Sequence, residues 1–340
     1  MTPQSKWWEV FSQNPPTEEE LKNLTSYYQR IHTINSSAIP SAIGSRYREY
    51  RAANKPPEKP STNIDYDKEF GDFNYKDWIG YAKQGQHLRK KASNSQDFAK
   101  VHINSKEPIY IMAFGDQQIG SWGTDYEQFE RITKEILETP NLYVFLMGDM
   151  LQMAIKMRSV VEVMDNLIPP KFQFKILEAW LSEIKHKVLA AVWCNHATMR
   201  EENVLGYSPT AELLAKNVIY HNHIGHFDLH LNDIQYNFAL SHFFAGRSML
   251  NPTHAPMRYL RMEAHDRDIA IQGDFHVPGI QKYTEGGSDK LAIVNGTIQT
   301  NSGYAKRFFS LKTFDYMPVV RLHPEKKLFT PFMTLEEAML

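Results

Sequence analysis

The chain has 340 residues, 42% of them apolar, with 38 basic and 39 acidic side chains. This length is enough for one large domain or two, and a net charge of −1 does not single out nucleic acid or an acidic surface as the partner. The single cysteine, Cys194, excludes an internal disulfide, which suits a reducing compartment. No apolar run approaches the roughly 20 residues that span a bilayer, and the first residues lack a signal-peptide core. We therefore expect a soluble cytoplasmic protein with no membrane partner.

Residues 1–105 differ in composition from the rest and predict a helical N-terminal extension. Thr17, followed by the acids Glu18 to Glu20, is typical of a capped helix start, and apolar residues then recur at helical spacing as far as Ile31. Further helices are indicated at 45–53 and 75–100. Between them, residues 54–65 contain Pro56, Pro57 and Pro60 and are typical of a linker or an extended arm.

Basic residues cluster in this extension, and two interpretations remain open. The cluster around Arg46, Arg48 and Arg51, with the run at 89–91, is compatible with a DNA-binding or docking appendage that faintly resembles a helix-turn-helix. The other interpretation is a helical collar, whose apolar residues around Leu21–Ile31 cover the main domain while a basic face stays in water. We favour the collar, because a charge cluster is usually a solvated surface.

From Glu107 onward, predicted strands and helices alternate, and the later part is rich in strands with short links. This pattern predicts an α/β (α+β) protein built on one sheet or two paired sheets with helices outside. The strands are expected at Ile109–Phe114, Leu142–Met147, Lys187–Trp193, His226–Leu231, Tyr236–Ser241, Ile269–Gln272, Leu291–Val294 and Val319–Leu322. The helices are expected at Asp125–Glu138, Phe172–Lys185, Pro209–Lys216 and His254–His265.

Several of these strands end in a residue type that binds metal ions. Asp116 and Gln118 follow the first strand and, two apart in extended chain, project to the same side. Further polar residues follow later predicted strands. Open α/β sheets bind their ligands at the carboxyl ends of the strands. The residues at these ends are Asp149, Asn195 with His196, His242, and Asp274 with His276. One Gly-Asp pair is an ordinary turn signal, but five such endings in sequence indicate a site.

The order of these motifs resembles that of the calcineurin-like metallophosphoesterase family, whose pattern is Asp-x-His, Gly-Asp, Gly-Asn-His-Asp/Glu, a lone His, and Gly-His-x-His. The resemblance covers roughly residues 107–322, and the stretches 120–126 and 247–251 look most like members encoded by bacteriophages. It implies a four-layer β-sandwich of two mixed sheets flanked by helices, occupying residues 106–340, with two divalent metal ions at one end.

By position, the resemblance implies a role for each strand-end residue. One ion would be held by Asp116, Gln118, Asp149 and His276, and the other by Asp149, Asn195, His242 and Asp274, so that Asp149 bridges them. A hydroxide between two such ions attacks a phosphate ester in line. His196 would then protonate the leaving oxygen as a general acid.

The chain departs from the family pattern at Gln118, Cys194, Ala197 and Asp274. Gln118 and Asp274 replace imidazole with oxygen donors, which favours Mn²⁺ or Mg²⁺ over Zn²⁺. Ala197 replaces the acid that usually orients the catalytic histidine. Two interpretations follow: a working phosphoesterase, which we favour, or a degenerate relative that keeps a metal as a staple in a binding or structural module.

Other residues suggest weaker hypotheses. Cys194 could be a nucleophile with His242 or His196 as its base, but a buried packing cysteine is the simpler interpretation. The histidines from His221 to His230 suggest a zinc cluster, although we favour strand-surface positions.

Arg200, Arg247 and His254 are candidates to contact a substrate phosphate, since arginine suits bidentate contact with phosphate oxygens. The expected partner is a phosphate ester, with DNA or a nucleotide favoured, and the sequence does not predict an oligomeric state.

Overall fold

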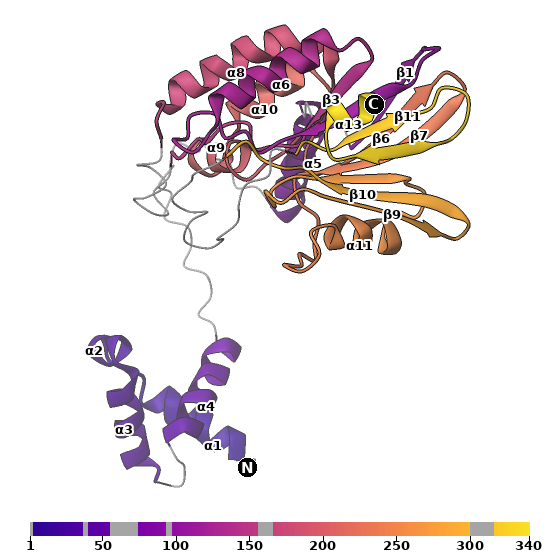
Figure 1. Ribbon diagram of the computed structural model, residues 1–340. Helices are drawn as coiled ribbons and strands as arrows, with labels where there is room; N and C mark the ends of the chain where they lie inside the picture. Colours follow the sequence, from indigo (N-terminus) through magenta and orange to yellow (C-terminus); the bar gives the residue numbers. More distant parts are fainter. Residues whose placement is uncertain (1–2, 37–39, 55–73, 93–96, 156–165, 300–315) are drawn as a thin grey trace. The chain divides into compact units, whose positions relative to one another are not determined.

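The computed structural model describes residues 3–36, 40–54, 74–92, 97–155, 166–299 and 316–340. The chain divides into two compact units, a helical unit, Met1–Lys83, and a sandwich unit, Gln84–Leu340 (Figure 1). Helix α5 (Tyr75–Ala92) crosses the boundary between them. Among the described residues, every helix is too short or too polar to cross a membrane.

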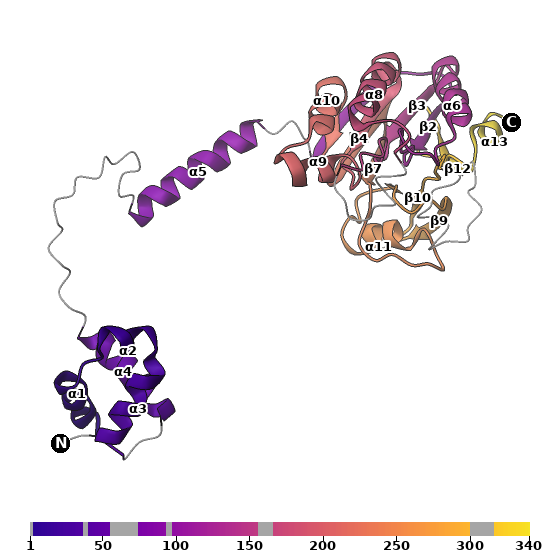
Figure 2. The same ribbon diagram turned by 90° about the vertical axis from the view of Figure 1, so that its left-hand side faces the viewer.

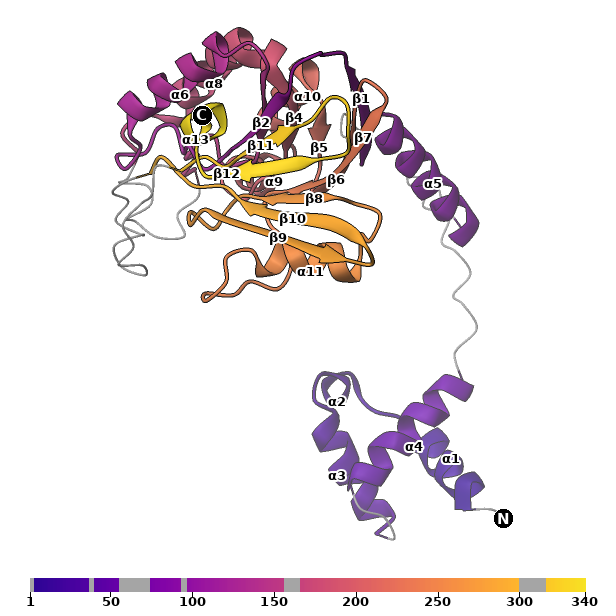
Figure 3. The same cartoon turned by 45° about the vertical axis from the view of Figure 1, so that its right-hand side comes forward.

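The helical unit contains α1 (Pro3–Gln13), α2 (Glu18–Lys22), α3 (Leu24–Ile34) and α4 (Pro40–Ala53). The predicted capping box at Thr17 is present, with Glu20 as its reciprocal partner. Glu20 also accepts hydrogen bonds from Arg30, at 2.7 Å from Nε and 2.8 Å from Nη2, which ties α2 to α3. The helices enclose a core of their own, made of Trp7, Phe11, Tyr27, Ile31, Ile43 and Tyr47 (Figure 3).

This core changes what the apolar periodicity of the extension means. Tyr27 and Ile31, which the collar interpretation placed against the main domain, are fully buried inside the helical unit, while Leu21 is exposed. The function of the extension stays a prediction. The helix predicted at 75–100 is correct as far as Ala92, but Phe98–Lys100 belong to a strand, β1 (Phe98–Ile103), which pairs with β6 of the sandwich unit.

The sandwich unit is built on two six-stranded mixed sheets. The first has the order β12-β11-β2-β3-β4-β5, and its strands are β2 (Ile109–Phe114), β3 (Leu142–Leu146), β4 (Val188–Val192), β5 (Tyr220–His221), β11 (Val319–Leu322) and β12 (Phe329–Phe332). The second has the order β1-β6-β7-β8-β10-β9, with β6 (Ile224–Leu231), β7 (Ile234–Ser241), β8 (Ile269–Gln272), β9 (Gly279–Glu285) and β10 (Ser288–Val294). Strands β2 to β5 run parallel, as do β7, β8 and β10.

The two sheets pack face to face between layers of helices. Side chains such as Ile111 and Phe145 of the first sheet meet Phe227 and Phe238 of the second in one buried cluster. On the outer face of the first sheet lie α6 (Tyr126–Glu138), α8 (Pro170–Ile184) and α10 (Pro209–Asn217). Helix α11 (His254–Met262) covers the outer face of the second (Figure 2). The predicted four-layer α/β fold of two mixed sheets flanked by helices is confirmed.

Every strand and helix predicted between Ile109 and Leu322 is present, with small shifts at the ends. The sequence pattern missed helix α1, the strands β1, β5, β9 and β12, the short helices α9 (Thr198–Leu205) and α13 (Leu335–Met339), and the 3₁₀ turn η1 (Lys185–Lys187).

Candidate metal centre

All the predicted ligand residues lie in loops that leave neighbouring parallel strands at one edge of the sandwich. Phe114 of β2 is paired with Leu146 of β3, so Asp116 and Asp149 leave the first sheet at about the same level. Ser241 of β7 is likewise paired with Gln272 of β8, just before His242 and Asp274. Because the carboxyl ends of parallel strands share an edge, five separate loops converge there.

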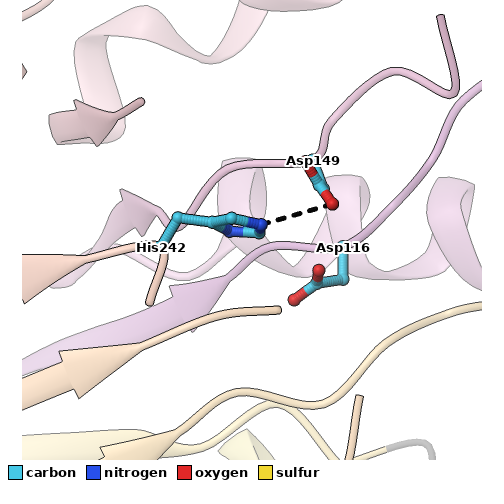
Figure 4. A group of neighbouring side chains, drawn as sticks. All are labelled: Asp116, Asp149 and His242. Atoms are coloured by element: carbon cyan, nitrogen blue, oxygen red, sulfur yellow. Dashed lines mark ion pairs between the residues drawn. The ribbon is translucent and has the colours of Figure 1, made fainter. Parts of the chain in front are cut away.

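Asp116, Asp149 and His242 come closest together. One carboxylate oxygen from each aspartate and one ring nitrogen of His242 all lie within 4.8 Å of one another, and all three residues are buried (Figure 4). His242 Nε2 is 3.2 Å from Asp149 Oδ2. Carboxylate oxygens and imidazole nitrogen are metal-ligand atoms, so the geometry of this trio fits a cation.

Asn195 joins this trio from the end of β4. Its Oδ1 lies 2.8 Å from His242 Nε2, and the carboxamide faces the carboxylate of Asp149, whose Oδ2 is 3.1 Å from the amide nitrogen if the group is rotated. His242 Nδ1 lies 2.7 Å from the carbonyl oxygen of Met147, which places its proton on Nδ1 and directs the Nε2 lone pair into the site.

Asp116 is held by hydrogen bonds to one oxygen, Oδ2, whereas the other makes none to a described residue. Its Oδ2 accepts hydrogen bonds of 2.9 Å from the backbone N–H of Asp274 and from Asn295 Nδ2. Its Oδ1 is buried, lies 3.3 Å from His276 Nε2 and makes no hydrogen bond to any described residue. A buried, unsatisfied carboxylate oxygen is costly, and a cation would account for it.

Gln118, His276 and Asp274 surround this trio. Gln118 Nε2 lies 3.4 Å from His276 Nε2, so the carboxamide must rotate before its oxygen can serve as a ligand. Asp274 Oδ1 is 3.7 Å from His242 Nε2, and its other oxygen forms an ion pair with Arg247. The structure therefore brings all seven predicted ligand residues to one edge, with Gln118 turned by its amide nitrogen toward His276.

Five of these residues have a left-handed backbone, with φ of 56° at Asp116, 46° at Gln118, 48° at Asp149, 64° at Asp274 and 59° at His276. Residues other than glycine rarely adopt this conformation, and each such case costs on the order of 1–3 kcal/mol. Clustering at one edge indicates that the surrounding structure imposes the strain, which is typical of functional sites.

The glycines that precede the aspartates leave room for the site. A Cβ atom on Gly148 would lie 2.6 Å from His242 Nδ1, and one on Gly273 would lie 2.6 Å from the carbonyl oxygen of Met147 and 2.8 Å from the same ring nitrogen. These two Gly-Asp pairs therefore combine a ligand with the space that the His242 ring requires.

The ionisable side chains of the site shift one another's pKa values. Burial alone would raise the pKa of Asp149, but the charges of His196 and His242 and the hydrogen bonds from both residues hold it well below its usual value. Burial opposes the charged form of His242, yet the neighbouring carboxylates of Asp149 and Asp116 raise its pKa to about 9. A proton and a cation therefore compete for His242 Nε2.

His196 lies beside the trio. Its backbone N–H donates to Asp149 Oδ1 at 3.0 Å, and its Nε2 is 3.7 Å from Asp149 Oδ2. Burial lowers the pKa of His196, although Asp149 acts in the opposite direction. Its Nδ1 is buried and has no hydrogen-bond partner among the described residues. Ala197, which replaces the orienting acid, is buried, and the nearby carboxylate of Glu201 is held by Ser208 and Thr210 instead.

Cys194 does not have the surroundings of a nucleophile. It is fully buried, and burial together with the charge of Asp149 raises the pKa of its thiol to about 12. Thiolate character is what makes a cysteine reactive, so the packing interpretation holds.

The histidines after β4 do not converge on a common point. His221 is buried, which corrects the expectation of a surface position. The ring of His223 packs against that of Trp193, with their centroids 4.7 Å apart, and His226 Nε2 lies 2.9 Å from the hydroxyl of Tyr259. These separate contacts do not form a zinc cluster.

The candidate phosphate contacts differ in position. Arg247 pairs with Asp274 and stands at the site itself. Arg200 Nη1 donates to the carbonyl oxygen of Gln152 at 2.8 Å, and His254 Nδ1 lies 2.6 Å from the carbonyl oxygen of Gly246 in the Arg247 loop.

Two residues after β10 were missed by the sequence analysis. Asn295 orients Asp116 through Oδ2, and Thr297 Oγ1 donates to the carbonyl oxygen of Asp116 at 2.7 Å. The signal was present, since Asn295 is another polar residue directly after a predicted strand.

The fold and the site together define an α/β protein of two mixed sheets that gathers metal-ligand side chains at one edge. No protein-family model matches the chain, and no curated protein matches it. Solved structures similar to it include vacuolar protein sorting 29 from Cryptosporidium parvum, with 12% identity over 67% of this chain and 100% of that chain and a TM-score of 0.36. Wild-type Vps29 from Entamoeba histolytica in complex with Zn²⁺ is 12% identical over 66% of this chain and 97% of that chain, with a TM-score of 0.33. A predicted phosphoesterase from Streptococcus pneumoniae TIGR4 is 14% identical over 67% of this chain and 99% of that chain, with a TM-score of 0.28. At these identities and scores, function has to be argued from the site.

Proposed function

We propose that the protein is a metal-dependent phosphoesterase of the calcineurin-like metallophosphoesterase type. The observation that carries the proposal is the convergence of Asp116, Asp149 and His242 on one point, with ligand atoms within 4.8 Å of one another. The order of the strand-end motifs supports the same assignment. Resemblance of the stretches 120–126 and 247–251 to bacteriophage-encoded members stays a prediction that none of the compared proteins tests.

The residues present fit two divalent cations. The buried Oδ1 of Asp116, which makes no hydrogen bond to a described residue, is the feature that a cation would satisfy. One ion would be held by Asp149, Asn195, His242 and Asp274, and the other by Asp116, Gln118, Asp149 and His276. Because most of these donors are oxygens, Mn²⁺ or Mg²⁺ is favoured over Zn²⁺. When bound, two such ions activate water and polarise the phosphate.

The chain's own residues have distinct tasks in this proposal. His196, outside the ligand trio but within 3.7 Å of Asp149, donates a proton to the leaving oxygen. Met147 fixes the tautomer of His242 through its carbonyl oxygen, and Asn295 fixes the carboxylate of Asp116. Arg247, paired with Asp274, is placed to exchange that carboxylate for a phosphate oxygen. A nucleic acid or a nucleotide is the favoured substrate.

A second candidate function is a metal-stapled binding or structural module without turnover. The observation that favours it is the unpartnered Nδ1 of His196, next to Ala197 in place of an orienting acid. A general acid that nothing orients loses much of its effect.

Hydrolysis and metal content together test both candidates. We would measure turnover of bis-para-nitrophenyl phosphate and para-nitrophenyl phosphate with Mn²⁺, Mg²⁺ or Zn²⁺, and bound metal by elemental analysis. Asp149→Asn should lose metal and turnover. Asp268→Asn is the matched control, because Asp268 is also buried but immediately precedes β8, at the other end of that strand, and pairs with Lys327.

Full metal retention in Asp149→Asn would contradict the site assignment. Metal that depends on Asp149, without turnover of either ester by the unmodified protein, would favour the binding module.

A further inference from the structure

We propose that the helical unit binds double-stranded DNA, with α4 lying in the major groove. This proposal concerns a surface remote in sequence from the metal centre and does not depend on catalysis. It begins from how α4 is held in its unit and from which of its faces remains exposed.

Aromatic packing fixes the orientation of α4. Tyr47 lies between α1 and α3, with its ring centroid 5.4 Å from that of Phe11 and 4.9 Å from that of Tyr27. Gly44 allows a close crossing of α3, because a Cβ atom there would lie 3.2 Å from the ring of Tyr28. With Ile43 also buried, one face of α4 is fully occupied by its own unit.

Away from this packed face, α4 presents exposed small, polar and charged side chains, among them the acid Glu49. Ser41, Ser45, Arg48 and Ala52 follow one another at intervals of three or four residues and are all exposed, so they lie along one line of the helix. Arg51, one turn after Tyr47, is also exposed, near the end of the helix. We call Ser41, Ser45, Arg48, Arg51 and Ala52 the α4 stripe.

The charge of the α4 stripe fits a polyanion. Helix α4 contains Arg46, Arg48 and Arg51 against the single acid Glu49, in a chain whose overall charge is −1. Three further acids, Glu18 to Glu20, lie on α2. The excess of arginines over acids gives α4 a positive charge in a near-neutral protein.

The shape and chemistry of the stripe favour duplex DNA over other polyanions. The major groove of B-DNA, about 12 Å wide, admits an α-helix, whereas that of A-form RNA is too narrow for side chains to read. Serine hydroxyls and arginines are donors suited to base edges and phosphates. A membrane-bound helix needs an exposed apolar face, but the apolar face of α4 is buried against Phe11 and Tyr27.

The packing of α4 directly after and against α3 supports this use. Residues 35–39 separate the two helices, which pack against each other and against α1 around Tyr47 (Figure 3). In helix-turn-helix proteins, the second helix of such a pair enters the major groove while the first contacts the backbone.

Fluorescence anisotropy of the full chain with a labelled duplex of mixed sequence tests the proposal. EDTA in the buffer prevents metal-dependent cleavage, so failure of the phosphoesterase proposal cannot affect the result. The double variant Arg48→Ala/Arg51→Ala should lower DNA affinity at least about tenfold. The plot of log K against the logarithm of salt concentration should also become less steep, its slope falling in magnitude by about two, because each lost phosphate contact removes about 0.9 from the slope.

Three further variants separate this surface from general charge effects. Arg131→Ala/Lys134→Ala on α6 removes the same charge from exposed positions of the sandwich unit and should change affinity less than twofold. Ser45→Glu, a good helix former that places a carboxylate in the stripe, should abolish binding. Substituting Arg89, Lys90 and Lys91 together with alanine removes the basic end of α5 and should leave most of the affinity. Circular dichroism of each variant shows whether the helices persist.

The proposal is overturned if the stripe variants bind DNA as the unmodified chain does. It is also overturned if the α6 pair or the α5 triple variant loses as much affinity as the stripe pair. Binding to phosphatidylserine vesicles, with no binding to DNA, would equally overturn it and assign the basic surface to a membrane.

Discussion

Replacing Gly148 with alanine tests whether the strand-end glycines are needed to build the metal centre. Gly148 has φ of +92°, and a Cβ atom there would lie 2.6 Å from His242 Nδ1 and 2.8 Å from the Cβ of Cys194. The left-handed conformation costs an alanine about 1–2 kcal/mol, and overpacking of a buried site adds about 1–3 kcal/mol. We therefore expect the free energy of unfolding of the sandwich unit to fall by about 2–5 kcal/mol.

Gly206→Ala is the matched control. Gly206 ends α9 with φ of +78°, and no atom lies within 4 Å of the position that its Cβ would take. The free energy of unfolding of Gly206→Ala should therefore fall only by the cost of the left-handed backbone, about 1–2 kcal/mol. Urea-dependent hydrogen exchange of peptides from β3 and β4 measures both values in the unit concerned.

The metal affinity gives a second, independent comparison. The Cβ of Ala at position 148 would displace the His242 ring, whose Nδ1 is held at 2.7 Å from the carbonyl oxygen of Met147. Calorimetric titration with Mn²⁺ should show weaker binding in Gly148→Ala and unchanged binding in Gly206→Ala. Equal losses of stability in the two variants, with metal affinity intact in both, would refute the reasoning.

Three other predictions concern the proton donor, the metal preference and the helical unit. His196→Ala should slow turnover about 10²–10⁴-fold without changing metal content, and a loss that is equal for good and poor leaving groups would argue against the acid role. Gln118→His should tighten binding of the ion expected at Asp116, Gln118, Asp149 and His276, because an imidazole replaces a neutral amide oxygen, and Asp274→His should shift preference toward Zn²⁺. Calorimetry that finds no change in Gln118→His would remove Gln118 from the ligands. Hydrogen bonds from Arg30 and from the N-cap backbone lower the pKa of Glu20 from 4.5 to about 2. Its contribution to stability is therefore complete above pH 4.5 and lost as the pH falls toward 2. Hydrogen exchange of α3 should become faster as the pH falls toward 2 than the intrinsic exchange rate explains. The pH-dependent loss of stability should be smaller in Glu20→Gln.

The residues of the metal centre could be predicted because each follows a short, apolar strand. Periodicity located β2, β3, β4, β7 and β8, and their parallel pairing then brought the following residues to one edge. Strand pairing does not determine how each side chain is oriented. Whether Gln118 presents oxygen or nitrogen, and whether Asp116 is held by Asn295, depends on contacts between loops that are far apart in sequence.

The missed strands share a weak apolar signal. β9 lies at the sheet edge and has no fully buried residue, so little of it needed to be apolar. β12 contains Pro331, which normally argues against a strand, but it too is an edge strand, where a missing donor is tolerated. β1 follows a helix of polar composition and carries Lys100 and His102, so its alternation was read as a continuation of that helix.

The helical unit shows what the spacing of apolar residues cannot predict. The spacing of Tyr27 and Ile31 correctly indicated a buried helix face, but spacing does not identify the surface that buries it. In the structure, Tyr47 and Phe11 of the same unit do so. Since the apolar face of α4 is occupied there as well, no neighbouring domain is needed to explain the burial of the helix. Arg48 and Arg51 of α4 stay exposed, and they are the residues for which we propose a polyanion as partner.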